Sequence, residues 1–320
     1  MNILQTLPKP FFVLAPMDDV TDTVFRRVIA DCAPPDLFFT EFVNVDGLQS
    51  PGRQHLMKKV LFTKGEKPII AQLWGKNPEN FYKTAQELVE MGFDGIDLNM
   101  GCPAKPVVKN GCGSALIENR PLAQAIIQAT KDGAAGQVPV SVKTRLGFKK
   151  VDLSWHEFLL QQDISMLTLH GRTQKEMSAV PAHWDLIGEV RALRDRIAPH
   201  TLYVGNGDVE SREEGEALAR QHGLDGIMVG RGIFHDPFLF AEQSPWMQFS
   251  RQQRIDLFIK HVTLFEETWG ENGRPLPPLY KFCKVYINHF DGAKELREKL
   301  MSAQSVAQLQ AMLQEARAQG

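Results

Sequence analysis

Gly95-Ile-Asp-Leu-Asn-Met-Gly-Cys-Pro103 joins a short strand pattern to a turn that carries a cysteine. The thiol of Cys102 lies between a glycine and a proline, directly after the end of the predicted strand. In a β/α barrel, catalytic groups project from the carboxyl ends of the strands. We therefore expect a strand, its carboxyl end and a chemically active group in this one segment.

Seven further short apolar runs flank this segment, and longer helix-like stretches separate them. Alternation of this kind indicates strand-helix units and a parallel sheet. Eight units over about 240 residues fit a closed (β/α)8 barrel. A doubly wound open sheet is the main alternative, since periodicity alone does not exclude it. The eight runs are residues 12–15, 37–40, 69–73, 95–98, 138–143, 166–170, 202–205 and 226–229.

Helices are predicted between the strands, among them residues 80–91 and 122–131. Asn77 and Asn119 are suited to cap them, with Pro78 and Pro121 in the first turn. The pattern changes after Gln243. We expect a barrel domain over residues 1–243 and a small all-helical domain over residues 244–320. Its predicted helices are 251–269, 279–290, 293–302 and 306–318, with a Gly/Pro-rich break at 270–278.

The composition is that of a globular protein, with 43% hydrophobic and 23% charged residues. The formal net charge of −2 excludes a generally basic nucleic-acid binder. Residues 244–320 contain ten Lys and Arg against eight Asp and Glu. This small excess fits a solvated helical surface at least as well as a surface that faces RNA.

The four cysteines form no Cys-x-x-Cys pair and no zinc spacing, so we predict no metal site. No signal peptide and no apolar stretch of about 20 residues is evident. A cytoplasmic location with free thiols is the simplest interpretation, with no membrane partner and no obligate protein partner. Cys32 and Cys283 lie in helix-like stretches and are predicted to be structural, and Cys112 lies in a glycine loop that is a candidate lid.

Polar or glycine-containing clusters follow most of the predicted strands, at the positions where a barrel enzyme holds its reacting groups. They are Ala15-Pro16-Met17, Gln72, Asn99 with Cys102, Lys143 with Arg145, His170 with Arg172, Asn206-Gly207-Asp208 and Gly230-Arg231-Gly232.

The last two clusters indicate a phosphate site, because glycine loops let backbone N–H groups approach an anion and Arg231 adds charge. Two tight turns are the alternative. Lys143 at the end of a buried-looking strand suggests a group that stabilises negative charge, or a salt bridge to a neighbouring strand. Gln72 and Asn99 suit the edge of a heterocycle or the loop backbone, and His170 suits phosphate, flavin or a hydrogen-bonded core.

Cys102 is the strongest single candidate. Free cysteines are most often inert core residues. A thiol held between glycine and proline at a strand end, without a metal-ligand spacing, instead indicates a general acid or a nucleophile.

At this point the residues resemble the tRNA-dihydrouridine synthases, flavoproteins with a TIM barrel and a C-terminal helical domain. The likeness runs through the whole barrel in order and is looser in the helical segment. The matching segments are Ala15-Pro-Met17, Thr21-Asp22 with Phe25-Arg26, Thr40-Glu41, Gln72-Leu-x-Gly75, Asp97-Leu-Asn-Met-Gly-Cys-Pro103, Gly111-x-Gly-Ser-Ala115, Ser141-Val-Lys-Thr-Arg-Leu-Gly147, His170-Gly-Arg-Thr173, Asn206-Gly-Asp208 and Val229-Gly-Arg-Gly232.

The resemblance implies FMN across the barrel mouth and NADPH as its reductant. Reduced FMN would deliver hydride from N5 to uracil C6, while Cys102 protonates C5. We then expect Cys102 and Lys143 to meet at the same mouth. The implied FMN contacts are Pro16, Met17, Asp18, Gln72, Lys143, His170, Asn206, Gly207, Asp208, Gly230 and Arg231.

The resemblance also implies that Asn99, Lys143 and Arg145 hold the uracil and stabilise charge on its carbonyls. The target base would be drawn out of the folded tRNA to reach them. Cations of the helical segment would bind tRNA phosphates. They are Lys281, Lys284, Lys294, Arg297 and Lys299.

One position departs from the family pattern. Many members carry a tyrosine eight residues after the histidine of the His-Gly-Arg motif, and this chain has Ser178 there. Two other functions stay open at this point: an FMN oxidoreductase of a free pyrimidine, similar to dihydroorotate dehydrogenase, and a non-catalytic RNA-binding flavoprotein. The helical segment and the Asn-x-Gly-Cys-Pro context favour tRNA reduction.

Overall fold

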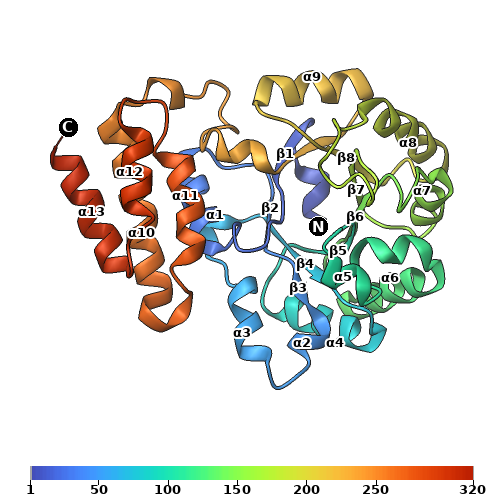
Figure 1. Ribbon diagram of the computed structural model, residues 1–320. Helices are drawn as coiled ribbons and strands as arrows, with labels where there is room; N and C mark the ends of the chain where they lie inside the picture. Colours follow the sequence, from blue (N-terminus) through green and yellow to red (C-terminus); the bar gives the residue numbers. More distant parts are fainter. Residues whose placement is uncertain (1, 320) are drawn as a thin grey trace.

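The computed structural model describes residues 2–319 and shows a barrel of parallel strands ringed by helices (Figure 1). The sheet order is β1-β9-β8-β7-β6-β5-β4-β2. A parallel bridge between Val13 and Leu37 joins its two edges, so the sheet closes. The strands are β1 Phe11–Leu14, β2 Phe38–Phe39, β4 Ile69–Trp74, β5 Gly95–Met100, β6 Val140–Arg145, β7 Met166–His170, β8 Leu202–Asn206 and β9 Gly226–Val229, and β3 Val43–Asn44 pairs with β4.

The predicted barrel is therefore confirmed, and the open-sheet alternative is wrong. Every predicted apolar run contains one barrel strand or most of it, and the bounds of β7 and β9 agree with the prediction at both ends. The surrounding helices are α1 Thr23–Cys32, α2 Val45–Leu48, α3 Arg53–Met57, α4 Pro78–Glu90, α5 Lys105–Lys109, α6 Arg120–Ala134, α7 Leu153–Leu160, α8 Trp184–Ile197 and α9 Arg212–His222.

The helix starts follow the sequence signals. The side chain of Asn77 accepts from the backbone N–H of Glu79 at 3.0 Å, and that of Asn119 accepts from the N–H of Leu122 at 3.3 Å. Each bond satisfies one of the N–H groups that a helix leaves unpaired at its first turn.

Buried apolar side chains form two groups. The larger group fills the space between strands and helices. The smaller group fills the barrel interior and is sealed at one end by η1 (Ile3–Thr6), whose Leu4 is 1% exposed. Since side chains alternate along a strand, this inner group supplies every second residue. Its strand members include Phe11, Val13, Phe39, Ile70, Met166, Leu202, Val204 and Met228.

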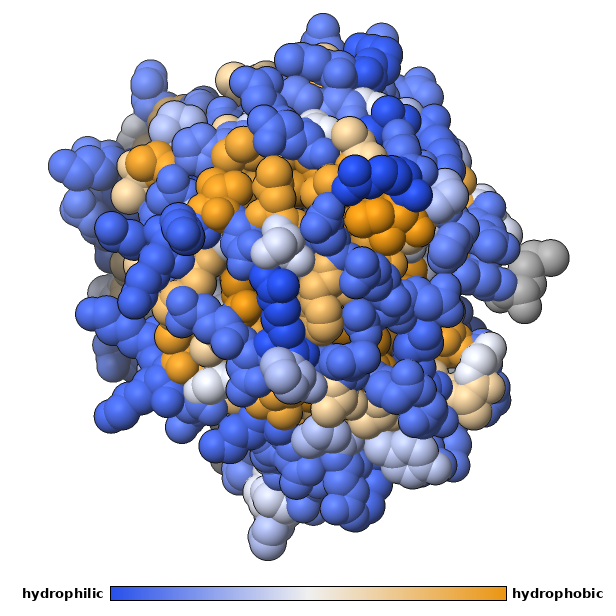
Figure 2. Space-filling model, turned by 90° about the vertical axis from the view of Figure 1, so that its right-hand side faces the viewer, coloured by the Kyte–Doolittle hydropathy of each residue, from blue (hydrophilic) through white to orange (hydrophobic). Residues whose placement is uncertain are grey.

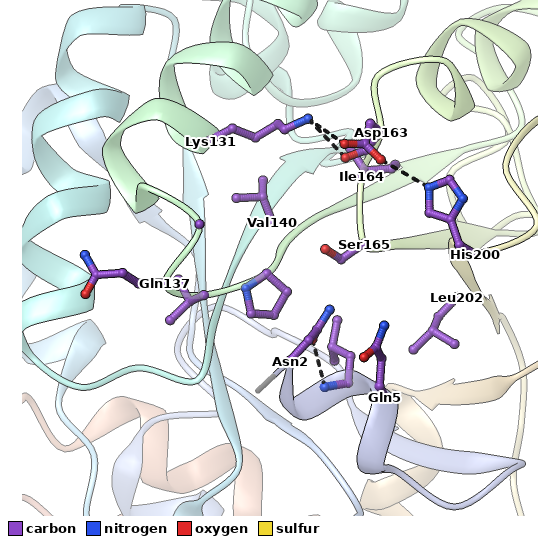
Figure 3. Close-up of a pocket in the computed structure, with 14 residues that line it drawn as sticks. Asn2, Gln5, Lys131, Gln137, Val140, Asp163, Ile164, Ser165, His200 and Leu202 are labelled. Carbon is purple, nitrogen blue, oxygen red and sulfur yellow. Dashed lines mark hydrogen bonds and ion pairs between the residues drawn. The ribbon is translucent and has the colours of Figure 1, made fainter.

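A cavity of about 330 Å3 lies beside η1, at the amino ends of β6, β7 and β8 (Figure 3). Its charged side chains bond one another: Lys131 Nζ donates to Asp163 Oδ2 at 3.3 Å, and His200 Nε2 lies 3.1 Å from Asp163 Oδ1. This end of a barrel is ordinarily devoted to stability, whereas reactions occur at the opposite end.

Four further helices pack against the α1 side of the barrel (Figure 1). They are α10 Arg251–Gly273, α11 Pro277–Tyr286, α12 Ala293–Leu300 and α13 Val306–Ala318. Phe25 of α1 packs against Phe282 of α11, with ring centroids 4.8 Å apart and the ring planes tilted by 37°, so the two parts share one apolar core. The division at residues 243 and 244 stays a prediction.

The predicted break at residues 270–278 is wrong in its bounds. Gly270 has non-helical backbone angles (φ 56°, ψ −166°), but helical structure resumes as far as Gly273. Helix α11 already begins at Pro277, because proline fits the first turn of a helix, and it ends four residues before the predicted end.

The outer surface is mainly polar. The side of the barrel turned toward the viewer in Figure 2 is largely hydrophilic, with hydrophobic side chains gathered near its middle. Within residues 2–319, no helix has both the length and the apolar character needed to cross a membrane.

Helices α4 and α6 approach each other closely at Gly133. A Cβ there would collide with the carbonyl oxygen of Tyr82 and lie 2.9 Å from the Cβ of Ala85. We predict that Gly133→Ala lowers the free energy of unfolding by about 1–3 kcal/mol, because overpacking forces the backbones apart. Gly52→Ala is the control, since its Cβ would meet only Ser50 Oγ at 3.5 Å. Equal urea midpoints for the two variants would contradict the close packing.

Candidate active site

A cavity of about 370 Å3 opens at the carboxyl ends of the barrel strands, a size within the usual range for small-molecule sites of about 300–1,000 Å3. The sequence prediction did not include three of its lining residues, Val209, Glu210 and His235. Nine of the eleven predicted cofactor residues line it: Pro16, Met17, Lys143, His170, Asn206, Gly207, Asp208, Gly230 and Arg231.

The other two predicted cofactor residues lie elsewhere. Gln72 is fully buried and is bonded to Asp97 and Asn99. Asp18 is half-exposed and pairs with Lys59 on the rim of the barrel. Neither lines the cavity.

Strand register brings the polar residues together. Asn99 pairs with Lys143 between β5 and β6, and His170 pairs with Arg145 on β6 and with Asn206 on β8. Neighbouring strands therefore carry these side chains at nearly the same height on one rim. Residues far apart in the sequence become one continuous polar surface.

Lys143 and His170 are the central groups of this surface. Burial and the nearby Arg145 lower the pKa of Lys143 to about 8. Its Nζ donates to Asn206 Oδ1 at 3.1 Å, and the Asn206 amide in turn donates to the carbonyl of Met228. Burial and the surrounding cations hold the pKa of His170 well below its usual range, so the ring is neutral. Its buried Nδ1 meets no hydrogen-bonding partner in the described part of the chain.

The loop after β8 requires glycine, and the loop after β9 leaves open space at its glycine. Gly207 has φ 140°, and a Cβ there would lie 2.6 Å from the Cβ of Ala182. A Cβ on Gly230 would make only ordinary contacts, with Ala15 Cβ at 3.8 Å and Met17 Sδ at 3.9 Å. The loops thus leave room for a ligand to approach the backbone.

Asp208 connects these loops to two arginines. It pairs with Arg172 and lies 3.0 Å from Arg231. Burial acts to raise its pKa, but the hydrogen bonds and the two positive charges outweigh burial and lower it. One carboxylate therefore serves two guanidinium groups, and Arg172 Nη1 is buried with no partner among residues 2–319.

Cys102 lies at the same mouth and is held by its backbone. Its N–H donates to Asn99 Oδ1 at 2.9 Å, and its carbonyl accepts from the N–H and hydroxyl of Ser114 at 3.1 and 3.0 Å. Burial raises the pKa of the half-buried thiol, although the backbone at Ala104 and the charges of Arg145 and Lys143 oppose the rise. The thiol is therefore protonated at neutral pH, which favours a general acid over a thiolate nucleophile.

The predicted meeting of Cys102 and Lys143 at one mouth is consistent with this geometry, since each charge acts on the pKa of the other. Arg145, expected on the substrate, is 8% exposed and donates to the carbonyls of Gly101, Thr173 and Met177. It therefore braces the loops around the thiol.

Two other sequence predictions have a different outcome. Cys112, the candidate lid residue, is 2% exposed and packs in the core, so it is no exposed lid group. Ser178, which replaces the expected tyrosine, is exposed, and its neighbour Met177 is a large exposed side chain of the same loop, 47% accessible.

A contact that the sequence prediction missed connects the C-terminal helices to the mouth. Arg274 pairs with the fully buried Glu41 and lies 3.5 Å from Asp22. Glu41 also accepts from the N–H of Asp19 at 2.8 Å, in the loop that contributes Met17 to the cavity. Only the Thr40-Glu41 motif pointed to this contact.

Asp18, Asp19 and Glu41 lie within 4.8 Å of one another, a spacing that suits a metal ion. However, Asp18 pairs with Lys59 and Glu41 pairs with Arg274. Protein cations thus already neutralise this group.

The predicted phosphate-binding cations of the helical segment do not form a single surface feature. Lys281 is exposed and its Nζ lies 3.5 Å from the carbonyl of Asp19, close to the mouth. Lys284 and Lys294 are exposed on α11 and α12. Arg297 donates to the carbonyl of Ile287, and Lys299 pairs with Glu315.

Solved structures of other proteins share this fold. Morphinone reductase has the same fold, with a TM-score of 0.52 at 12% identity over 86% of this chain and 90% of that one. Its complex with tetrahydroNAD matches with a TM-score of 0.51 at 14% identity, over 75% and 89%. At this identity the likeness establishes the TIM-barrel fold alone.

Sequence comparison identifies the family. The family model described as "Dihydrouridine synthase (Dus)" matches residues 13–319. A "Probable tRNA-dihydrouridine synthase" of Staphylococcus aureus (strain COL) is 47% identical over 99% of this chain and 96% of its own. A "Probable tRNA-dihydrouridine synthase 2" of Bacillus subtilis (strain 168) is 48% identical over 98% and 95%. The chain belongs to the dihydrouridine synthase family.

Removal of Arg274 tests the contact between the helices and the mouth. Arg274→Ala leaves the buried Glu41 without its cation, and we predict a loss of about 3–5 kcal/mol in the free energy of unfolding. Burial already raises the pKa of Glu41. Loss of Arg274 raises the pKa of Glu41 further. The folded variant therefore loses stability as pH rises through the raised pKa of Glu41, and the loss in the free energy of unfolding is larger at alkaline than at mildly acidic pH.

Urea unfolding at two pH values measures this effect. Lys260→Ala is the control, since Lys260 pairs with Asp31 across the same contact but both side chains are about half exposed. Lys260→Ala should lower the free energy of unfolding by no more than about 1 kcal/mol. Equal losses in the free energy of unfolding would show that the buried Arg274–Glu41 pair stabilises the protein no more than the exposed Lys260–Asp31 pair.

Proposed function

We propose that this protein reduces uridine in tRNA to 5,6-dihydrouridine, with FMN as its bound cofactor and NADPH as reductant. The observation that carries the proposal is the convergence of a protonated, rigidly held thiol and a ligand-sized cavity lined by Lys143 and Arg231 at one barrel mouth. Membership of the family and the names of the relatives supply the substrate.

The residues present fit FMN. The loops at Asn206–Gly207–Asp208 and Gly230–Arg231 suit a phosphate, because glycine exposes their backbone and Arg231 carries charge. The unpaired Nδ1 of His170, a residue that lines the cavity, offers a polar atom to a ligand. We assign the ring contacts to Pro16, Met17 and Lys143, with Asp18 at the rim and Gln72 below the floor.

The residues of the mouth would hold FMN, which, when reduced by NADPH, would supply the hydride that passes from its N5 to C6 of the uracil. Cys102 donates its proton to C5, in keeping with its raised pKa. Lys143 stabilises negative charge on a uracil carbonyl, a role that its half-buried position strengthens. Asn99 and Arg145 complete the base site mainly by fixing the loop of Cys102.

The C-terminal helices are assigned to tRNA, with residues 1–243 as the catalytic barrel and 244–320 as the tRNA-binding domain. The target base leaves the tRNA stack to enter the mouth. Lys281, Lys284 and Arg297 contact phosphates, and Lys281 lies nearest to the mouth. A tRNA substrate places the protein in the cytoplasm.

The reaction can be tested in the absence of oxygen. We expect flavin-loaded protein to be bleached by NADPH and reoxidised by tRNA that lacks dihydrouridine. Cys102→Ala should retain flavin but lose about 10²–10⁴-fold in the rate of reoxidation, the usual contribution of a general acid. Cys32→Ala, at the end of α1, is the matched control and should react normally.

Three outcomes would contradict the proposal. Full activity of Cys102→Ala would remove its acid role. Efficient reoxidation by free uracil or dihydroorotate, but not by tRNA, would favour a small-molecule enzyme. Failure to bind any flavin after reconstitution would exclude both enzymes.

Salt dependence tests the tRNA surface. We predict that Lys281→Ala and Lys284→Ala each raise the Kd for tRNA and reduce the slope of log Kd against log salt by about 0.7–0.9, the value for one phosphate contact. Lys83→Ala on α4, where Lys83 pairs with Glu79, is the control. An unchanged slope in both helical variants would place the tRNA elsewhere.

A further inference from the structure

Asp97 is a fully buried carboxylate inside the barrel, for which the proposed reaction has no role. It lies on β5, between Gln72 on β4 and Ser141 on β6. Ser141 Oγ donates to Asp97 Oδ1 at 2.6 Å, and Gln72 Nε2 donates to Asp97 Oδ2 at 2.7 Å. A buried carboxylate is costly, so its retention calls for an explanation.

The carboxylate imposes a direction on the hydrogen bonds beyond it. Burial raises the pKa of Asp97 to about 6, so at neutral pH it is ionised and can only accept. Gln72 must therefore present its NH2 group to Asp97 and its oxygen to the other side. There Gln72 Oε1 accepts from Asn99 Nδ2 at 2.9 Å.

The orientation of Gln72 in turn fixes the orientation of the Asn99 amide, which contacts the loop that carries Cys102. With its NH2 group committed to Gln72, Asn99 can only turn its oxygen toward the loop. Asn99 Oδ1 accepts from the N–H of Gly101 at 3.1 Å and of Cys102 at 2.9 Å. A reversed Asn99 amide would place NH2 against these two N–H groups and break both bonds.

The other side of the loop is rigid, so the thiol has little freedom once Asn99 is fixed. Arg145 Nε donates to the carbonyl of Gly101 at 2.8 Å, and Ser114 holds the carbonyl of Cys102. A Cβ on Gly113 would lie only 2.8 Å from that carbonyl oxygen, which shows how closely the next loop packs.

We propose that Asp97 is a positioning residue for Cys102, which sets the orientation of the Gln72 and Asn99 amides and through them the place of the thiol. The kinetic part of this inference rests on the proposed function. The position of the thiol can be measured without it.

Asp97→Asn tests the inference with an isosteric change. The new amide no longer dictates which end of Gln72 faces it, so Asn99 can reverse. We expect kcat for tRNA to fall on the order of 100-fold, as a small misplacement of a reacting group can cause, with KM and flavin content unchanged. Thr168→Val is the control, because its hydroxyl is buried in the same barrel and bonded to no described residue.

A double variant, Asp97→Asn with Gln72→Glu, restores the direction of the hydrogen bonds between strands β4 and β5. The carboxylate introduced at position 72 accepts from both neighbours, so the Asn99 oxygen again faces the loop. This variant should recover most of the lost kcat. If Asp97→Asn does not fold, the double variant alone decides. A double variant that does not fold, or that is no faster than Asp97→Asn, overturns the proposal.

Alkylation of Cys102 by iodoacetamide, followed on its peptide by mass spectrometry, measures the thiol directly. The alkylation rate of Cys102 should change in Asp97→Asn and return to the wild-type value in the double variant. The alkylation rate of Cys32 in the same sample should stay constant. Wild-type kcat together with a wild-type alkylation rate in Asp97→Asn would overturn the inference. If the native protein did not reduce tRNA, the proposed function would fail, yet the alkylation series would still decide the role of Asp97.

Discussion

A cluster of four cations at the carboxyl rim of a closed parallel barrel is the feature on which the site depends. Closure forces the ends of β6, β7 and β9 onto one rim, with Lys143, Arg145, Arg172 and Arg231 at or near the cavity. Asp208 pairs with two of these cations, and Glu210 adds a second carboxylate to the lining of the cavity. Burial lowers the pKa of Lys143 and Arg145, which shows that the charged forms are disfavoured there. An anionic ligand would reduce the repulsion among these cations, and the phosphate of the proposed FMN would be such a ligand.

The same rim gives Cys102 surroundings that differ from those of Cys32 and Cys283. Cys32 and Cys283 have pKa values raised to about 12 by burial among apolar side chains. Cys102 is also desolvated, but its backbone is bonded to the polar side chain of Asn99, and the charges of Arg145 and Lys143 act on its thiol. Its thiol keeps its proton at neutral pH, and in the proposed reaction the two cations would stabilise the thiolate that remains once the proton has been given to the substrate.

Much of the fold and part of the candidate site could be predicted from the sequence. Apolar runs located each barrel strand, and strand ends located Lys143, His170 and the glycine loops, because these depend on local pattern. The inner polar network could not be predicted, since it depends on which side chains meet across strands. Gln72 was expected at the cofactor and instead bonds Asp97 and Asn99. Arg274 was missed because its partner, Glu41, lies 233 residues away in the chain.

A crystal structure of the protein with bound FMN tests the central claim most directly. The account predicts the phosphate between the loops at Gly207 and Gly230, the ring beside Lys143 and the Cys102 sulfur facing the open side of the ring. A phosphate bound elsewhere, or a ring that leaves no space beside Cys102 for a nucleobase, would contradict it.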